Sequence, residues 1–127
     1  MAESILRIKS KQFAVDIIHA CREMRKNKVE YALIDQLLRS GTSVGANIHE
    51  AQFAHGTKDF ISKLEIALKE CNECDYWLDI LLSTQSIDTI KSNMLSAECE
   101  EIRKILISSV NTLKSKQKPD AGVNRHD

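Results

Sequence analysis

The sequence predicts an all-α protein, an antiparallel up-down-up-down four-helix bundle. Three observations support this fold class. The composition favours helices, because the 127 residues include one proline and four glycines and many leucine, isoleucine, lysine, glutamate and alanine residues. Apolar residues recur at the three-and-four spacing that places them on one face of a helix. Four such patterns follow one another with only short polar connections between them, and short connections make neighbouring helices antiparallel.

The first helix is expected from about Ser4 to Lys28 and the second from about Glu30 to Ala54. Two inward positions of the second helix are glycines, Gly41 and Gly45. Glycine inside a helix costs about 1 kcal/mol relative to alanine. A close approach of a neighbouring helix or a bend would offset this cost, or the fold simply tolerates it. The other inward residues expected in these helices are Phe13, Ala14, Ile17, Ile18, Cys21, Met24, Ile34, Leu37, Leu38, Val44 and Ile48.

The third helix is expected from Thr57 to about Thr84 and the fourth from about Asp88 to Lys114. The segment His55-Gly56-Thr57 is predicted to end the second helix, turn through a left-handed glycine and cap the third helix with Thr57. We expect the bundle to span residues 1–116, followed by a flexible tail over 117–127 that has little to bury. The inward residues expected here are Phe60, Leu64, Ala67, Leu68, Cys71, Cys74, Leu78, Leu81, Leu82, Leu95, Cys99, Ile102, Leu106, Val110 and Leu113.

Charge and hydropathy narrow the functional classes. Lysine and arginine total 18, as do aspartate and glutamate, so the net charge is zero, whereas dedicated nucleic-acid-binding proteins are usually basic. No apolar run approaches the roughly 20 residues of a membrane span, and the first residues lack the apolar region of a secretory signal. The four cysteines show no dense pattern, which is typical of reduced thiols. We therefore expect a cytoplasmic protein with no membrane partner.

A motif in the central third of the chain goes beyond helical periodicity. The strings are QLLRSGTSVGANIHEAQ, residues 36–52, and KDFISKLEIALKECNECDYWLDIL, residues 58–81. They resemble the family of four-helix-bundle proteins typified by the 23S rRNA intervening-sequence proteins, which also includes the accessory variability protein of diversity-generating retroelements. The positions that match the family pattern are Gln36, Leu37, Arg39, Ser43, Val44, Asn47, Ile48, Glu50, Phe60, Leu64, Ala67 and Leu68. Four positions depart from it. Gly45 stands where proline is common and Ala54 stands where many relatives carry arginine, and His49 and Ala51 also differ from the family pattern.

The resemblance implies an antiparallel four-helix bundle that assembles into a homo-oligomer, typically a pentameric ring. For the retroelement branch it also implies a basic surface that binds nucleic acid and a reverse transcriptase, which is a nucleic-acid enzyme. Within the motif, it implies that Arg39, Asn47 and Glu50 belong to a structural polar cluster that caps or cross-links helices.

An apolar patch formed by Ile66, Trp77 and Ile80 lies off the inward line of the third helix. At 100° per residue, these three residues and Glu73 fall within about 60° of one another. An aligned patch with the only tryptophan is typical of a protein interface. The alternative is a broad buried face, since a helix in a bundle can be covered on two sides. We predict that the patch is the oligomer interface.

A basic strip formed by Arg7, Lys11, Arg22 and Arg25 follows one flank of the first helix. The four residues fall within a sector of about 60°. Such segregation is typical of a surface that contacts phosphates, and the alternative is an ordinary solvated polar face. In a ring, each subunit would contribute one copy of the strip, so the number of weak phosphate contacts would be several-fold higher. The basic strip is therefore the candidate site for RNA or DNA.

No catalytic or metal site is predicted. Cys71 and Cys74 form a C-x-x-C pair, but structural zinc needs four ligands and the sequence offers no second pair of this kind. A di-iron bundle would need Glu-x-x-His motifs, and the chain has none. We expect a non-enzymatic protein without a cofactor. Two functions remain open: an oligomeric bundle that binds RNA or DNA, and a protein–protein adaptor or assembly module without nucleic acid.

Overall fold

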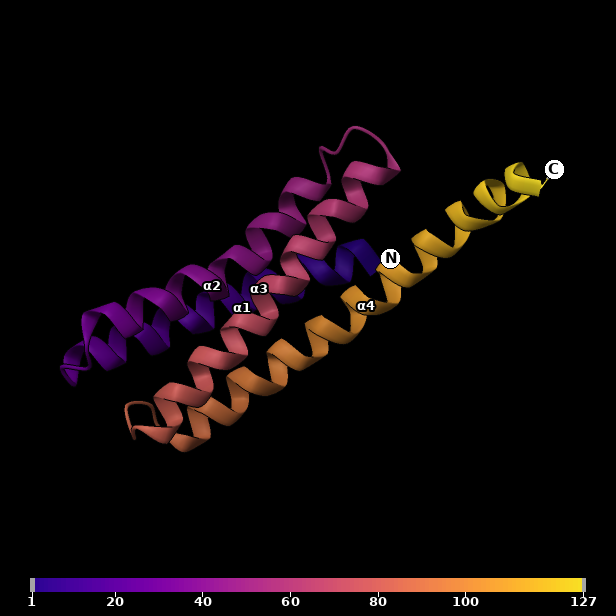
Figure 1. Cartoon of the computed structure of the whole chain (residues 1–127). Helices are drawn as coiled ribbons and strands as arrows, with labels where there is room; N and C mark the ends of the chain where they lie inside the picture. The colour runs from indigo at the N-terminus through magenta and orange to yellow at the C-terminus, as the bar shows by residue number, and fades with distance from the viewer. Residues whose placement is uncertain (1, 127) are drawn as a thin grey trace.

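The computed structural model describes the backbone of residues 2–126 and the side chains of residues 2–117. Within this range it contains four helices and no strand, which confirms the all-α prediction. The helices are α1 (Ala2–Lys26), α2 (Tyr31–Ala51), α3 (Thr57–Ser83) and α4 (Thr89–His126) (Figure 1). The turns α1–α2 and α3–α4 lie at one end of the bundle and the turn α2–α3 lies at the other.

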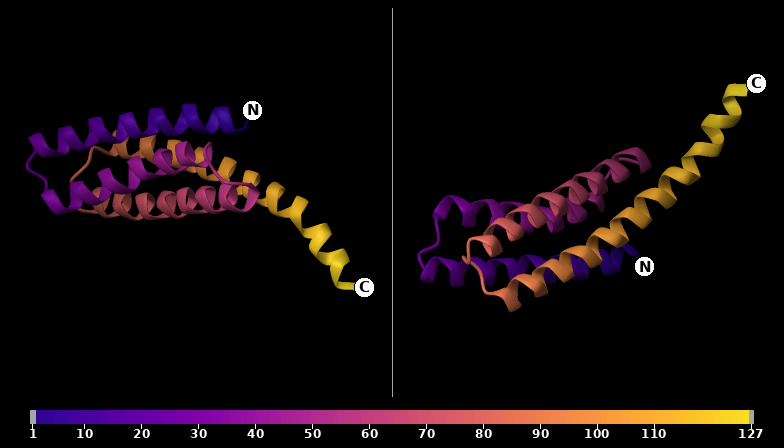
Figure 2. Two further views of the ribbon diagram at one scale, coloured as in Figure 1. Left: turned by 90° about the horizontal axis from the view of Figure 1, so that it is seen from above. Right: turned by 60° about the horizontal axis from the view of Figure 1, so that its bottom comes forward.

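The helix α4 continues to His126, whereas the sequence predicts that it ends near Lys114. Figure 2 shows this last part of α4 extending beyond the other three helices. It therefore has no neighbouring helix to pack against. The side chains from residue 118 onward lie outside the described part of the chain, so the flexible tail over 117–127 stays a prediction.

The turns α1–α2 and α3–α4 share one hydrogen-bonding pattern. In the first, the Val29 N–H donates to the Met24 carbonyl at 3.1 Å and the Lys28 N–H donates to the Arg25 carbonyl at 3.0 Å. These are the two bonds of a Schellman motif, with a left-handed residue just after the helix. That residue is Lys28, with φ of 62°, and its counterpart after α3 is Gln85, with φ of 59°. Both helices therefore stop without the glycine that usually occupies this position.

The turn α2–α3 differs from the prediction in two details. Gly56 has φ of 103° and ψ of 176°, so it lies outside the left-handed helical region that was expected. It is nevertheless in a conformation that favours glycine. Gly56, rather than Thr57, is the N-cap of α3. The Asp59 carboxylate instead accepts the His55 N–H at 3.0 Å, which fixes the chain as it enters the helix.

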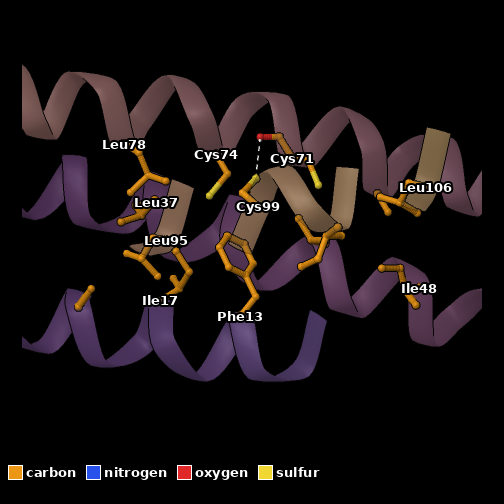
Figure 3. Close-up of a cluster of buried hydrophobic side chains, with 14 of the residues drawn as sticks. Phe13, Ile17, Leu37, Ile48, Cys71, Cys74, Leu78, Leu95, Cys99 and Leu106 are labelled. Atoms are coloured by element: carbon orange, nitrogen blue, oxygen red, sulfur yellow. Dashed lines mark hydrogen bonds between the residues drawn. The ribbon is translucent and has the colours of Figure 1, made fainter. Parts of the chain in front are cut away.

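The inward-facing residues predicted from periodicity form the core. Phe13, Ile17 and Leu37 are fully buried at its centre (Figure 3). The helix α2 packs on α1 and α3, and α4 also packs on α1 and α3, with the smallest of these contacts between α1 and α4. Predicted core residues that are only half-buried include Ala14, Ile18, Leu38, Phe60, Leu68, Leu82 and Leu113.

The glycines of α2 mark where α1 approaches most closely. A Cβ atom on Gly41 would lie 2.8 Å from Cγ1 of Ile17, and one on Gly45 would lie 3.2 Å from the backbone oxygen of Ser10. Real Cβ atoms essentially never lie within 3.0 Å of another heavy atom. Close helix packing therefore accounts for Gly41, and the same approach is tight but less severe at Gly45.

Candidate functional site

The structure divides the basic strip into two halves with different surroundings. Near the end of α1, Arg25 lies 4.0 Å from the Asp35 carboxylate, and its guanidinium carbon lies 5.5 Å from the Tyr31 ring centroid. At the beginning of α1, Arg7 donates to the neutral Gln52 Oε1 at 2.8 Å. Among the described residues, no carboxylate forms an ion pair with Arg7 or Lys11. Arg22 has no such ion pair either, so among the described residues Arg25 is the one member of the strip that a carboxylate pairs.

The first half of the basic strip borders a groove between α1 and α2, here called the α1/α2 groove. Its volume is about 460 Å³. The bottom consists of small residues, and the basic side chains are those of Arg7, Lys11 and His49. No aspartate or glutamate lines it. The complete lining is Arg7, Ser10, Lys11, Ala14, Thr42, Gly45, Ala46, His49 and Gln52. The arrangement suits an anionic, extended ligand that approaches the helix backbones closely.

A second cavity opens at the end of the bundle that carries the α2–α3 turn. Its volume is about 590 Å³ and its inner wall is apolar, with Leu6, Phe60 and Leu113. Its charged lining residues are Arg7 and Glu3, of opposite sign. This end cavity therefore lacks the single sign of charge that characterises the α1/α2 groove.

The predicted polar cluster of Arg39, Asn47 and Glu50 is not joined into one network. Arg39 cross-links α2 to α3, because its guanidinium binds the Glu70 carboxylate at 3.3 Å and also binds Glu73. Asn47 donates to the Ser43 carbonyl of its own helix at 2.9 Å, and Glu50 is exposed. The family resemblance implied that the three form one cluster, but the partners of Arg39 lie on another helix.

A second arginine cross-link, which the sequence did not predict, joins α3 to α4. Arg103 donates to the Asn72 side-chain oxygen at 3.2 Å and also binds the carboxylates of Asp75 and Glu100. The sequence contained a signal for this contact, because Arg103 follows the inward Ile102 and therefore flanks the core. Its partners depend on the register between the two helices, which periodicity does not give.

The apolar patch lies at the side of α3 that carries the carboxylates bound by Arg39. Trp77 is half-buried and packs against the core, although helical spacing predicts that it lies off the inward line of the helix. Its indole N–H donates to the Glu73 carboxylate at 3.2 Å. Ile80 is half-buried and Ile66 is 39% exposed. Ile66 is therefore the member of the patch most available to a partner.

Residues 3–108 match the family described as 23S rRNA-intervening sequence protein.

The chain belongs to this family.

The membership confirms the resemblance carried by residues 36–81. The family fold is also seen in the crystal structure of a protein with unknown function from the S23 ribosomal protein family of Bacteroides thetaiotaomicron. That protein is 41% identical in sequence, with a TM-score of 0.84, and the match covers 87% of this chain and 99% of that chain. No curated protein matches the chain. Among the residues described, no helix is long and apolar enough to cross a membrane.

Three buried thiols of this family member meet between α3 and α4. Cys71 and Cys74 of α3 lie opposite Cys99 of α4, whose thiol contacts the Cys71 carbonyl oxygen at 3.5 Å (Figure 3). When Cys99 loses its proton, the thiols of Cys71 and Cys74 can donate to its sulfur, which lowers the pKa of Cys99 and raises the pKa of both donors. No set of three or more His, Cys, Asp or Glu residues suited to a metal occurs in the described part. All three thiols are fully buried, in keeping with small core residues.

A pair of carboxyl groups lies between α1 and α4, and the sequence did not predict it. Burial raises the pKa of Glu98 to about 7, and the neighbouring Asp16 carboxyl contributes to the same shift, as does Glu101. The Oε1 atom of Glu98 is buried without a hydrogen-bond partner. Ionised carboxylates only accept hydrogen bonds, so a proton on Glu98 is needed for it to donate to Asp16. Lys9 of α1 pairs with Glu101 at 2.9 Å.

We expect the free energy of unfolding to fall as the pH rises from 4.5, the ordinary pKa of a glutamate, to about 7. In this window the folded chain retains a proton on Glu98 that the unfolded chain has released, so raising the pH favours unfolding. Solvent screening reduces the effect to about 1 kcal/mol. Urea denaturation at pH 5 and pH 8 measures it.

Glu98→Gln mimics the protonated carboxyl and should be more stable than the wild type at pH 8, with a weaker pH dependence. Glu23→Gln, at an exposed position of α1 that does not contribute to the shift of Glu98, is the matched control and should keep the wild-type pH dependence. If Glu98→Gln and the wild type depend on pH equally, Glu98 is not the responsible group.

Proposed function

We propose that this chain is a non-enzymatic, antiparallel four-helix-bundle protein of the cytoplasm that assembles into a homo-oligomer and binds RNA. The pentameric ring implied by the family resemblance is the leading assembly. The observation that carries the RNA-binding proposal is the α1/α2 groove, where Arg7 and Lys11 face no carboxylate. The family description refers to 23S rRNA, which favours RNA as the polyanion. The proposal includes no catalytic step and no cofactor.

Assembly explains how a chain with no net charge could bind a polyanion. A single α1/α2 groove offers only a few cations, and such a contact is weak at physiological salt. A ring presents the groove once per subunit. Several weak contacts on one RNA chain then act together, because binding at one subunit raises the effective concentration at the next.

A protein–protein adaptor without nucleic acid is the second candidate. It is favoured by the pairing of Arg25 with Asp35, which removes charge from the basic strip. It is also favoured by exposed aromatic residues such as Tyr31 and Phe53, which are 66% and 67% exposed. Aromatic side chains are enriched where proteins meet. A nucleic-acid enzyme would be one partner of such an adaptor.

RNA binding should be weak, tolerant of sequence and strongly dependent on salt. The groove supplies phosphate contacts, and the one aromatic ring among its lining residues is the His49 imidazole, so it offers little surface on which bases stack. Each neutralised phosphate contributes a slope of about −0.7 for single strands and about −0.9 for duplexes in log affinity against log salt. Fluorescence anisotropy with labelled single-stranded and duplex RNA, at several salt concentrations, measures affinity and slope. If the wild-type protein binds neither RNA at low salt, the adaptor function replaces this proposal.

A further inference from the structure

The sequence places four cations on one flank of α1, but the structure gives them unequal access to a ligand. Arg25 is held by Asp35 and by the Tyr31 ring. Arg22 is exposed and does not line the α1/α2 groove. Arg7 and Lys11 do line it. Only the first half of the basic strip therefore combines free positive charge with a concave surface.

Few side-chain atoms line the bottom of the groove, because α1 and α2 are closely packed there. A Cβ atom on Gly45 would lie 3.2 Å from the Ser10 backbone oxygen, so α2 has little room for a side chain at this position. Ala46, the next residue, is exposed and lines the groove. A ligand can thus approach the helix backbones while its charges meet the side chains of the rim.

The cations are spaced along the groove rather than clustered at one point. Arg7 and Lys11 are four residues apart and lie on the same face of α1, about 6 Å apart along the helix axis. Arg7 is positioned by Gln52, whose amide also lies 3.3 Å from His49 Nδ1. A chain with regularly repeated negative charges fits this row better than a single anion.

We propose that the α1/α2 groove is the binding site for the RNA sugar–phosphate backbone, with Arg7 and Lys11 binding successive phosphates and Ala46 lying beneath the backbone. This inference rests on the proposed function and assigns it to one half of the basic strip. Arg22 and Arg25 take no part. Charge complementarity selects the ligand, because every ionisable side chain in the groove lining is basic.

The test compares two pairs of variants at exposed positions, where folding tolerates substitution. In the first pair, Lys11→Gln and Arg22→Gln each remove one cation from α1. In the second pair, Ala46→Leu fills the groove without changing charge, and Ala32→Leu adds the same side chain to an exposed position of α2 outside the groove. Helicity by circular dichroism confirms folding for each variant, and RNA affinity is measured against salt.

We expect Lys11→Gln to weaken RNA binding about tenfold, as for a lost hydrogen bond between charged groups. It should also flatten the salt slope by about one unit for each subunit that contacts the RNA. Ala46→Leu should weaken binding several-fold at an unchanged slope, whereas Arg22→Gln and Ala32→Leu should remain within about twofold of the wild type.

Three outcomes would overturn the inference, and they are distinguishable. If the wild type binds RNA but Arg22→Gln weakens binding as much as Lys11→Gln does, the RNA-binding site lies elsewhere on the protein and the proposed function stands. The same conclusion follows if Ala46→Leu has no effect on RNA binding. If polyglutamate of matched charge displaces RNA as well as unlabelled RNA does, the groove binds acidic peptides. If the wild type does not bind RNA at all, the proposed function fails together with its site.

Discussion

Replacing Gly41 by leucine should destabilise the fold by about 3 kcal/mol or more, a large share of the roughly 5–15 kcal/mol that stabilises a domain. The first atom of the new side chain would lie 2.8 Å from Cγ1 and 3.0 Å from Cγ2 of Ile17. Both atoms are attached to the branched Cβ of a fully buried residue, so Ile17 cannot turn away. The helices α1 and α2 would have to separate. Urea denaturation of the wild type and the variant measures the loss.

Two further variants isolate the cause. Removing the obstructing atoms with Ile17→Ala should allow Gly41→Leu to recover part of the loss, so the two changes should couple strongly in a double-mutant cycle. Ala46→Leu makes a comparable addition at an exposed position of the same helix and should change the stability by less than about 0.5 kcal/mol. A Gly41→Leu variant as stable as the wild type would show that α1 and α2 separate easily.

An aspartate at Ile66 should dissociate the assembly and leave the bundle folded. Ile66 is 39% exposed in the single chain, so the subunit alone tolerates a charge there. In an interface the same charge would be buried without a partner, which costs several kcal/mol. Light scattering should give the mass of an oligomer for the wild type at tens of micromolar protein and the mass of a monomer for the variant.

Trp77→Asp is a less specific test of the same interface, because Trp77 also packs on its own core and donates to Glu73. The variant should therefore lose folding stability as well as assembly. Ile107→Asp is the matched control, since Ile107 is 41% exposed, much like Ile66, but lies on α4 and outside the apolar patch. A wild type that scatters as a monomer, or an Ile66→Asp variant of unchanged mass, would contradict the predicted interface.

Hydrophobic periodicity predicted most of the core but not its polar members. Ser40 and Ser10 are buried, although hydroxyl groups interrupt an apolar pattern. The structure shows why burial is tolerated: Ser40 donates to the Gln36 carbonyl at 2.8 Å and Ser10 donates to the Arg7 carbonyl at 3.4 Å. Bonds to the preceding turn satisfy the hydroxyls within the helix. A pattern based on apolar residues alone does not identify such buried serines.

The sequence predicted that four cations share one flank of the first helix, but it did not predict the groove that makes part of this flank a candidate binding site. Angular position placed Arg7, Lys11, Arg22 and Arg25 together, because that requires only the geometry of one helix. The pairing of Arg25 with Asp35 and the groove beside Lys11 involve α2, and they depend on how the two helices are aligned. Arg39 illustrates the same limit, since both of its carboxylate partners lie on α3.

The small contact between α1 and α4 bears on how the chain folds. In the described part of the chain, every other helix contact joins elements that are consecutive along the chain, and α1 with α4 is the one pairing that closes a long loop. Consecutive pairs form early, since little chain entropy is lost when a short loop closes. The α1–α4 contact also brings the Asp16 carboxyl toward Glu98 and contains the Lys9–Glu101 ion pair. Docking of α1 against α4 is therefore expected to follow the transition state, which would make this contact a determinant of the unfolding rate more than of the folding rate.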